Sequence, residues 1–365
     1  MEAFSGILNW NIKNQGFSFH PKCEKLEISH LCFADDLFIL CGADVISAIT
    51  IKDSLEELNQ RAGLSPNAQK CQVFFSGVAA SVKLDICHIL NMKEGFFPVK
   101  YLGVPRISSR LSSKECKELV EKIAKRIHSW VNRSLSYAGR LQLILSILYS
   151  IQVYWSSLFI LPKGVLKEIE RMMSNFLWSR SDLKSNKNKV AWAALCTPKN
   201  EGGLGIKRLV DWNKASMLRH IWSICTSKES LWVIWCHTYI LKGRSFWVIN
   251  MQVEMSWTWK KILKLRPTAK KFISSKLGNG ENTFLWFDSW LPRGSLVDRF
   301  GENIMYALNS SPIAKIFSVG EKGWWRWFPT GRRRWSIDIT SKVMKIIRLI
   351  PHDFVLNPNK DDSIM

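Results

Sequence analysis

The sequence predicts an α+β protein in which a short mixed region precedes a longer, mostly helical one. Hydrophobic residues make up 47% of the 365 positions, with 12 prolines and 20 glycines, enough apolar material for about two or three packed domains. Strand-forming runs are confined to the first 110 residues. Beyond residue 111, apolar residues recur at three-to-four spacing, which is typical of amphipathic helices.

The first 105 residues carry the strand signals. Residues 30–40 (HLCFADDLFIL) are rich in strand formers on both sides of an Asp pair and predict a β-hairpin with that pair at its tip. Residues 48–62 show a helical apolar stripe that stops before Gly63, a residue suited to a helix C-terminus. Residues 72–76 predict a strand, and residues 99–105 a strand followed by a turn.

The next region predicts three helices. Between residues 116 and 130 apolar side chains recur with helical period, and cations including Lys122, Lys125 and Arg126 occupy other positions. A second helix is expected over residues 137–151 and a third after Pro162. Residues 180–189 form a polar, lysine-bearing stretch that predicts a loop and a domain boundary.

The last 180 residues are helical in tendency and hold most of the 18 tryptophans. Several tryptophans alternate with cations, as in residues 257–266 and 324–335. Exposed, such rings could stack on nucleic-acid bases or help to grip phosphates. Buried, they pack a core, and we favour this second interpretation because tryptophan is highly buried on average.

Residues 141–161 contain no formal charge and are long enough to cross a bilayer. They also contain two glutamines and four serines, whose polar groups would need partners in lipid. The segment therefore predicts a buried helix followed by an extended piece, and no membrane partner.

The cysteines and the N-terminus predict an intracellular protein, in the nucleus or cytoplasm. The nine cysteines are scattered and form no CxxC pair, which is typical of free thiols in a reducing compartment. Glu2 stands where a secretory signal would have basic residues, so we expect no secretion.

Charge is distributed unevenly along the chain. Residues 1–110 hold equal numbers of basic and acidic residues, so the whole net charge of +22 lies in residues 111–365. A basic region of this size attracts a polyanion, either a nucleic acid or an anionic membrane. A basic surface that serves only solubility is the simpler alternative.

The adjacent carboxylates of Asp35 and Asp36 are the strongest chemical signal. Apolar residues flank them on both sides, which predicts that they lie at the edge of a buried strand pair. Two like charges in a partly dry site repel each other unless a cation compensates. Magnesium binds one or two carboxylates together with water and phosphate oxygens. A solvated Asp-Asp turn is the alternative for a bare pair.

Phe33-Ala34-Asp35-Asp36 in this strand context resembles the catalytic hairpin of reverse transcriptases, in particular those encoded by non-LTR (LINE-type) retrotransposons of plants. Further segments resemble the same family in the same order along essentially the whole chain. These are GLSPNAQKCQVFFSGV (63–78), VKYLGVP (99–105), HSWVNRSLSYAGRLQLILSIL (128–148), FLWSRSD (176–182), VAWAALCTPKNEGGLGIKRLVDWNKA (190–215) and GNGENTFLWFDSW (278–290).

The resemblance implies an incomplete polymerase palm over residues 1–105, an antiparallel sheet with helices. It also implies a helical thumb over residues 106–180 and a Trp-rich basic linker region over residues 181–365, which in this family precedes a zinc-binding domain that we expect to be missing here. The implied activity is RNA-directed DNA polymerisation by two Mg²⁺ (or Mn²⁺) ions. The implied partners are an RNA template and a DNA primer, or an RNA–DNA hybrid. The sequence does not predict an oligomeric state.

Site residues follow from the same resemblance. Asp35 is expected to bind metal with Asp36 as its weaker neighbour, because consecutive strand residues point to opposite faces. Lys70 is expected to approach the leaving phosphates. The residues expected to contact nucleic acid are Tyr101, Leu102 and Gly103 in the primer-grip segment, and Lys122, Lys125, Arg126 and Arg140 in the thumb.

One feature departs from the family. These polymerases require another metal-binding aspartate upstream of the hairpin, and residues 1–34 contain none. We therefore expect a central fragment that binds magnesium weakly and is inactive or nearly so alone. The alternatives are a non-enzymatic nucleic-acid-binding protein and a decayed coding remnant that aggregates early because its palm strands keep unpaired edges.

Overall fold

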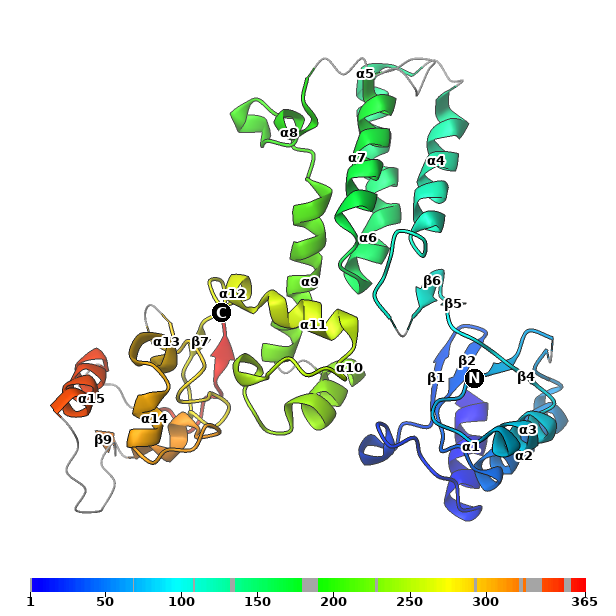
Figure 1. The fold of residues 1–365 in the computed structure, drawn as a ribbon, viewed down its shortest axis with the longest axis horizontal. Helices are drawn as coiled ribbons and strands as arrows, with labels where there is room; N and C mark the ends of the chain where they lie inside the picture. Colours follow the sequence, from blue (N-terminus) through cyan, green and yellow to red (C-terminus); the bar gives the residue numbers. More distant parts are fainter. Residues whose placement is uncertain are drawn as a thin grey trace. The chain divides into compact units, whose positions relative to one another are not determined.

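The computed structural model describes residues 2–67, 69–107, 109–131, 135–178, 190–226, 229–291, 294–321, 324–325, 337–350 and 356–365. It divides into two compact units. Unit 1 comprises residues 1–107 together with Thr238–Ile240, and unit 2 comprises residues 108–237 and 241–365 (Figure 1). The predicted loop at residues 180–189 lies outside the described residues, as do Trp327, Trp335 and the side chains of Trp324 and Trp325.

Unit 1 combines three helices with short strands. Its elements are α1 (Glu2–Asn14), the 3-10 helix η1 (Glu24–Leu26), β1 (His30–Phe33), β2 (Asp36–Ile39), α2 (Val45–Ala62), β3 (Gln72–Val73), α3 (Ala80–Leu90), β4 (Lys93–Glu94), β5 (Val99–Tyr101) and β6 (Val104–Arg106). Helix and strand together confirm the predicted α+β class at this coarse level.

The core of unit 1 lies between its helices. α1 packs on α2 and α2 packs on α3, with Phe4, Leu8 and Ile51 buried among them. α2 starts three residues earlier than predicted, because the Asp44 carboxylate caps the helix by accepting a hydrogen bond from the Ser47 N–H at 2.7 Å. It ends as predicted before Gly63, whose φ is +66°.

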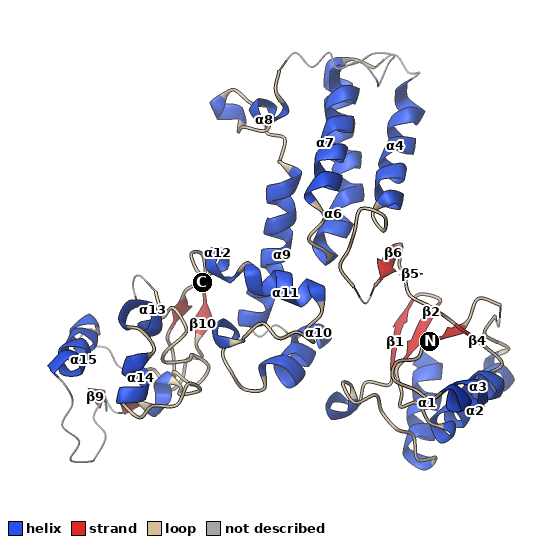
Figure 2. Ribbon diagram, in the orientation of Figure 1, coloured by secondary structure: helices blue, strands red, loops and turns tan. Residues whose placement is uncertain are grey.

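The strands do not form one antiparallel sheet. Within the described residues of unit 1 they make three separate two-stranded sheets, shown in red in Figure 2. β1–β2 and β5–β6 are antiparallel hairpins, whereas β3 and β4 are parallel and are joined through α3. The expected strand over residues 72–76 is only two residues long. The assignment of this unit to a polymerase palm remains a proposal.

Unit 2 is mostly helical. Its longer helices are α4 (Lys117–Val131), α5 (Tyr137–Leu143), α6 (Tyr149–Leu158), α7 (Lys163–Trp178), α9 (Leu209–Cys225), α11 (Trp257–Lys264) and α15 (Ile337–Leu349). Its shorter helical elements are η2 (Ile144–Leu148), α8 (Trp192–Leu195), η3 (Lys199–Glu201), α10 (Leu231–Trp235), η4 (Cys236–Leu241), η5 (Phe246–Val248), α12 (Arg266–Ala269), α13 (Leu296–Phe300), α14 (Asn303–Ala307) and η6 (Ile316–Ser318). Its strands are β7 (Ser275–Lys276), β8 (Gly320–Glu321), β9 (Trp324–Trp325) and β10 (Ser363–Ile364).

α5, η2 and α6 form one continuous helical run that extends past the predicted end at residue 151. η2 is a π-helical turn, in which the backbone hydrogen bonds skip one extra residue. By length and composition the run Tyr137–Leu158 could cross a membrane, although core helices of soluble proteins pass the same test. α5 packs on α7, and α6 packs on α4 and α9, which supports the predicted buried helix.

The tryptophans of unit 2 that the structure describes include several core residues. Trp259, Trp286 and Trp290 are buried, in agreement with the favoured interpretation. Trp286 belongs to the buried apolar cluster of residues 275–365, which we call the C-terminal module. Around it pack apolar side chains of α13, α14 and α15. All nine cysteines are unpaired, as predicted.

Candidate functional site

The predicted catalytic hairpin forms with a tight turn. β1 and β2 pair from His30 opposite Ile39 to Phe33 opposite Asp36, so Ala34 and Asp35 make a two-residue turn and Asp36 opens β2. Ala34 has a φ of +49°. This left-handed conformation is strained for a residue with a Cβ, and such strain clusters at functional sites.

The hairpin is exposed rather than buried, which corrects the sequence-based expectation. Asp35 and Asp36 are exposed, and Phe33 and Leu31 keep 60% and 40% of their surface accessible. The physical reason is that β1 and β2 form a two-stranded sheet with no third strand beside them in the described part of the chain. α1 covers only the base of the hairpin, where Ser5 Oγ lies 2.7 Å from His30 Nε2. Burial lowers the pKa of His30.

The two carboxylates do not by themselves fit a two-magnesium site. The described residues hold no group of three or more His, Cys, Asp or Glu side chains placed to bind a metal ion. Two adjacent carboxylates on one turn can supply ligands to one side of a hard cation, which then needs oxygens from elsewhere. The hairpin therefore offers part of a metal site.

Lys70 lies in a turn organised by Asn67. The Asn67 carbonyl accepts hydrogen bonds from the N–H groups of Lys70 and Cys71, and its side-chain oxygen accepts one from Gln69. The Lys70 side chain is exposed, and no ion pair or hydrogen bond joins it to Asp35 or Asp36 among the described residues. Lys70 is therefore not joined to the carboxylate pair by a polar contact in the part of the chain that the structure describes.

The predicted primer-grip segment forms a second hairpin. Leu102 and Gly103 connect β5 to β6 with φ of +50° and +74°, the backbone that a two-residue type I′ turn requires. Tyr101 faces Val104, and the Arg106 guanidinium lies 5.0 Å from the Tyr101 ring centre. The Tyr101 ring also lies 5.9 Å from that of Phe38 on β2. This contact links the two predicted functional hairpins.

α4 presents the predicted basic face. Lys122, Lys125 and Arg126 are exposed, while Ile123 and Ile127 on the opposite side are buried. Among the described residues no acidic side chain pairs with these three cations. Their charge is therefore available to an external anion.

Arg140 does not belong to this surface, which corrects its expected contact with nucleic acid. Only 8% of the residue is accessible. It lies on α5, which packs on α7, and the nearby Tyr137 ring contacts Trp178 at 5.3 Å. In a run with almost no charges the sequence pattern could not show which face of this helix is covered.

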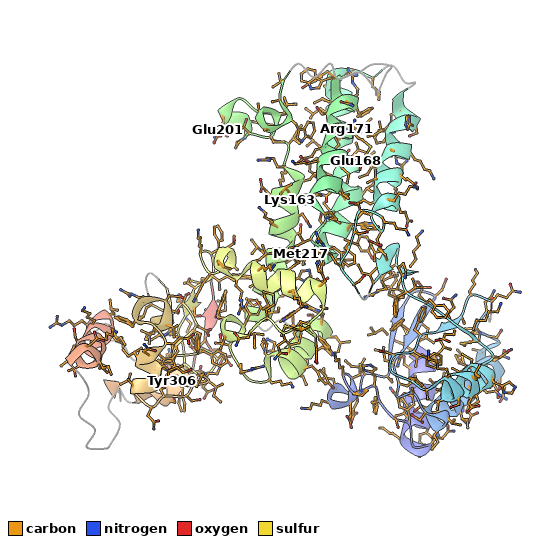
Figure 3. All side chains as sticks on the ribbon, viewed as in Figure 1. Lys163, Glu168, Arg171, Glu201, Met217 and Tyr306 are labelled. Atoms are coloured by element: carbon orange, nitrogen blue, oxygen red, sulfur yellow. The ribbon has the colours of Figure 1, made fainter. Side chains whose placement is uncertain are left out.

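A second group of cations joins two lysines of the Trp-bearing stretch 257–266 to cations from distant parts of the sequence. Burial lowers the pKa of Lys261, and repulsion by Lys264, Arg110 and Lys163 lowers it further. Lys261 and Lys264 belong to α11, Arg110 to the segment before α4, and Lys163, labelled in Figure 3, is the first residue of α7. Arg110 and Lys163 lie about 150 and 100 residues before the two lysines of α11, so no local sequence pattern indicates that these cations come together. No acidic partner neutralises it within the described chain.

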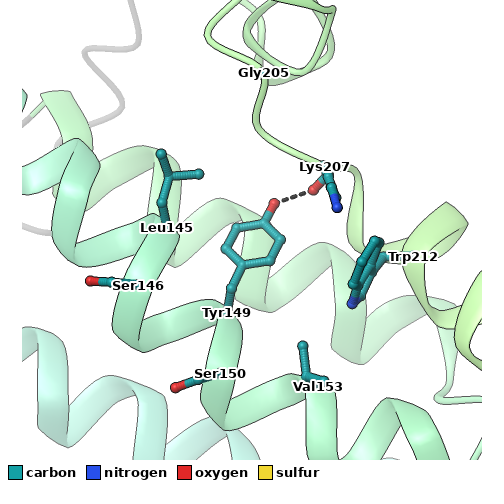
Figure 4. A pocket seen from close by; sticks show the side chains of 8 residues that line it. All are labelled: Leu145, Ser146, Tyr149, Ser150, Val153, Gly205, Lys207 and Trp212. Atoms are coloured by element: carbon teal, nitrogen blue, oxygen red, sulfur yellow. Dashed lines mark hydrogen bonds between the residues drawn. The ribbon is translucent and has the colours of Figure 1, made fainter.

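A shallow hollow of about 410 Å³ lies beside η2 and is lined by Leu145, Ser146, Tyr149, Ser150, Val153, Gly205, Lys207 and Trp212 (Figure 4). The Tyr149 hydroxyl donates a hydrogen bond to the Lys207 carbonyl, and burial raises the Tyr149 pKa. The Lys207 ammonium lies 3.8 Å from the Trp212 ring centre. Because Tyr149 and Lys207 are engaged within the protein, this arrangement stabilises the segment before α9 and offers no reactive group.

Comparisons with known proteins relate the chain to plant sequences. It is 29% identical over 201 residues to an Arabidopsis thaliana protein named "Putative ribonuclease H protein", covering 53% of this chain and 32% of that protein. It is 27% identical over 143 residues to an uncharacterized mitochondrial protein of Arabidopsis thaliana, covering 39% of this chain and 93% of that protein. No known family model matches the chain.

The first match spans about a third of the relative's length, and neither name refers to a reverse transcriptase. Together the similarities support a retroelement-related protein.

Proposed function

We propose that the chain is a segment of a retroelement-derived RNA-directed DNA polymerase and that it binds RNA–DNA hybrids but does not polymerise alone. The observation that carries the proposal is the β1–β2 hairpin, with Asp35 in a strained two-residue turn and Asp36 at the start of β2. Both carboxylates are exposed on this turn, so a divalent cation can reach them from solvent. Asp35 would be a magnesium ligand, and Asp36 its weaker neighbour.

The second hairpin supports the same proposal. The Tyr101 ring, at the end of β5, lies 5.9 Å from the Phe38 ring on the strand that Asp36 begins. A primer strand lying over Leu102 and Gly103 would meet little side-chain bulk at Gly103. We therefore assign Leu102 and Gly103 to holding the primer backbone. Lys70 would contact the leaving phosphates of the nucleotide once a further protein segment completes the site.

Unit 2 supplies the charge for holding the hybrid. The exposed cations of α4 and the unneutralised group around Lys261 both belong to the region that carries the entire net charge of +22. Cations near a nucleic acid release its condensed counterions, which favours binding without reading sequence.

A non-enzymatic nucleic-acid-binding protein is the second candidate function. It is favoured by the absence, among the described residues, of a third metal-binding side chain near the hairpin. The two candidates share the binding surface and differ in whether Asp35 and Asp36 take part in chemistry. The intracellular location and the magnesium or manganese requirement belong to the polymerase proposal.

The full 365-residue chain is expected to show no template-directed synthesis in a primer-extension assay with Mg²⁺ or Mn²⁺. Positioning supplies most of the catalysis in phosphoryl transfer, and one carboxylate pair cannot position two ions. Robust synthesis that the Asp35→Asn variant abolishes would contradict this expectation and establish a complete enzyme. Addition of a protein segment that supplies further carboxylates would restore synthesis if the polymerase proposal is correct.

Hybrid binding is expected to weaken when Lys122, Lys125 and Arg126 are all changed to alanine. The slope of log K against log salt should become shallower by up to about 0.9 for each phosphate contact that is lost. Fluorescence anisotropy over a salt series measures both quantities. The Asp35→Asn/Asp36→Asn double variant is the control and should bind at least as tightly as the wild type. An unchanged slope in the triple variant would remove α4 from the binding surface.

A further inference from the structure

A single carboxylate in the C-terminal module collects an unusual number of hydrogen bonds. Asp362 Oδ1 accepts from the N–H groups of Gly278 and Gly280 at 2.7 and 2.9 Å. Asp362 Oδ2 accepts from the N–H groups of Asn282 and Thr283, both at 3.0 Å, and from the Thr283 hydroxyl at 2.8 Å. We call these five donors the Asp362 nest.

The backbone of the nest is shaped for this occupant. A Cβ atom on Gly278 would lie 2.0 Å from the Lys360 carbonyl oxygen and 2.5 Å from that of Asp361, so only glycine lets the tail approach. Gly280 has a φ of +75°, and a Cβ there would lie 2.8 Å from the Phe317 nitrogen. Successive N–H groups that converge in this way form concave sites for anions.

The residues around Asp362 add few other attachments. β10 pairs with β7 over only two residues on each strand, extended by reciprocal hydrogen bonds between Met365 and Ser274 at 2.8 Å. The Asn357 N–H donates to the Gly278 carbonyl at 2.9 Å. A pair of two-residue strands is marginal in water by itself. The charged group in the nest is therefore the strongest single attachment of residues 356–365.

The electrostatics agree with an anion site. Burial raises the pKa of Asp362, but the hydrogen bonds from the nest outweigh burial and hold the pKa below its usual range. Lys315 is the nearby cation: its ammonium donates to the Asn282 carbonyl at 3.0 Å. Burial lowers the pKa of Lys315, while the charges of Asp288 and Asp362 raise it.

We propose that the Gly278–Thr283 loop is a carboxylate-binding site whose ligand is the Asp362 side chain of the same chain, and that this contact latches residues 356–365 onto the C-terminal module. The site is independent of the polymerase proposal, since it touches neither hairpin nor the basic face of α4. Its chemistry is recognition of a two-oxygen anion by backbone donors. Hydrogen bonds to a charged group stabilise by about 1.5–3 kcal/mol in general, more than neutral ones.

Hydrogen exchange of the full chain, followed by mass spectrometry of peptides covering residues 277–284 and 356–365, tests the latch. The Asp362→Asn variant keeps the size of the side chain but turns an amide NH₂ toward two of the donors. We expect exchange at least about tenfold faster in both peptides. Peptides from α4 should exchange as in the wild type, which shows that the rest of the chain stays folded.

Asp361→Asn is the matched control, because it removes the same charge from the neighbouring residue, which accepts one exposed hydrogen bond from Asn279 at 3.2 Å. It should leave both peptides protected. Unchanged exchange in Asp362→Asn, or an equal effect of Asp361→Asn, would overturn the proposal. Wild-type protection that depends on protein concentration would also overturn it, since the tail would then come from a second copy.

Discussion

Replacing Trp286 with alanine is expected to lower the free energy of unfolding of the C-terminal module by about 3–5 kcal/mol. The side chain is 1% accessible and belongs to the same buried cluster as apolar residues of α13, α14 and α15. Its indole N–H donates a hydrogen bond to the Ser310 hydroxyl at 2.8 Å. Alanine would leave a large cavity, which the neighbouring helices could fill only by shifting. It would also leave the Ser310 hydroxyl without its indole donor.

Tyr306→Ala is the matched control for this prediction. Tyr306 lies on α14 in the same module but is 64% accessible, and Figure 3 shows it at the surface. Its loss should change stability by less than about 0.5 kcal/mol, as is usual for surface substitutions. Thermal unfolding followed by circular dichroism, with hydrogen exchange of residues 285–310 to assign the transition, measures both variants. Equal effects would show that the module is not organised around Trp286.

Stability of the same module is expected to fall by about 3 kcal/mol as the pH rises from about 4 to 6, because of Asp288. Burial raises the pKa of this carboxyl from 3.8 to about 6. The Phe284 N–H at 2.8 Å, the Ser245 hydroxyl at 3.0 Å and the charges of Lys315 and Lys270 oppose the shift without cancelling it.

The sign follows from proton binding. Between pH 3.8 and about 6 the unfolded chain has lost the Asp288 proton and the folded chain still holds it. Raising the pH through this window therefore favours unfolding, and the loss is complete above pH 6. Asp362 acts in the opposite direction and at lower pH. Its pKa is depressed, so its contribution is present at neutral pH and is lost only as the solution is acidified below about 4.

Asp288→Asn isolates this contribution. The amide oxygen can still accept the hydrogen bond from the Phe284 N–H, and the amide NH₂ can donate to the Ser245 oxygen, so the variant should fold. Because an amide does not titrate, the decline in unfolding free energy between pH 4 and 6 should disappear. Asp298→Asn, in α13 of the same module, is the control. Hydrogen bonds and charge from Lys270 and Ser295 overcome burial and lower the Asp298 pKa, so this variant should keep the decline. Denaturant unfolding at several pH values measures the slopes, and identical slopes in Asp288→Asn and the wild type would refute the assignment.

Local chemistry made much of the fold predictable. The hairpin around Asp35, the end of α2 at Gly63, the turn at Gly103 and the two faces of α4 all follow from residues within a few positions of each other. The start of α2 differs from the prediction by three residues, because the Asp44 carboxylate caps the helix ahead of the apolar stripe. These features depend on propensity and periodicity, which a single sequence carries.

Features that depend on distant partners were not predictable. The exposure of Phe33 depends on how many strands join the sheet, and the burial of Arg140 depends on which face of α5 meets α7. The cations around Lys261 come together from three segments. The Asp362 nest joins residues about 80 positions apart, and nothing in the GNGENT stretch indicates which carboxylate will occupy it.

The π-helical turn η2 affects how the continuous helical run α5–η2–α6 packs on its neighbours α7 and α9. A π turn holds one more residue than an α turn, so the side chains that follow it lie about 100° behind their positions on an unbroken α-helix. With this phase the buried side of α5, which carries Arg140, packs on α7, and the buried side of α6, which carries Gln152 and Trp155, packs on α9. On an unbroken α-helix the residues of α6 would be rotated about 100° further around the axis, away from the direction in which they pack on α9.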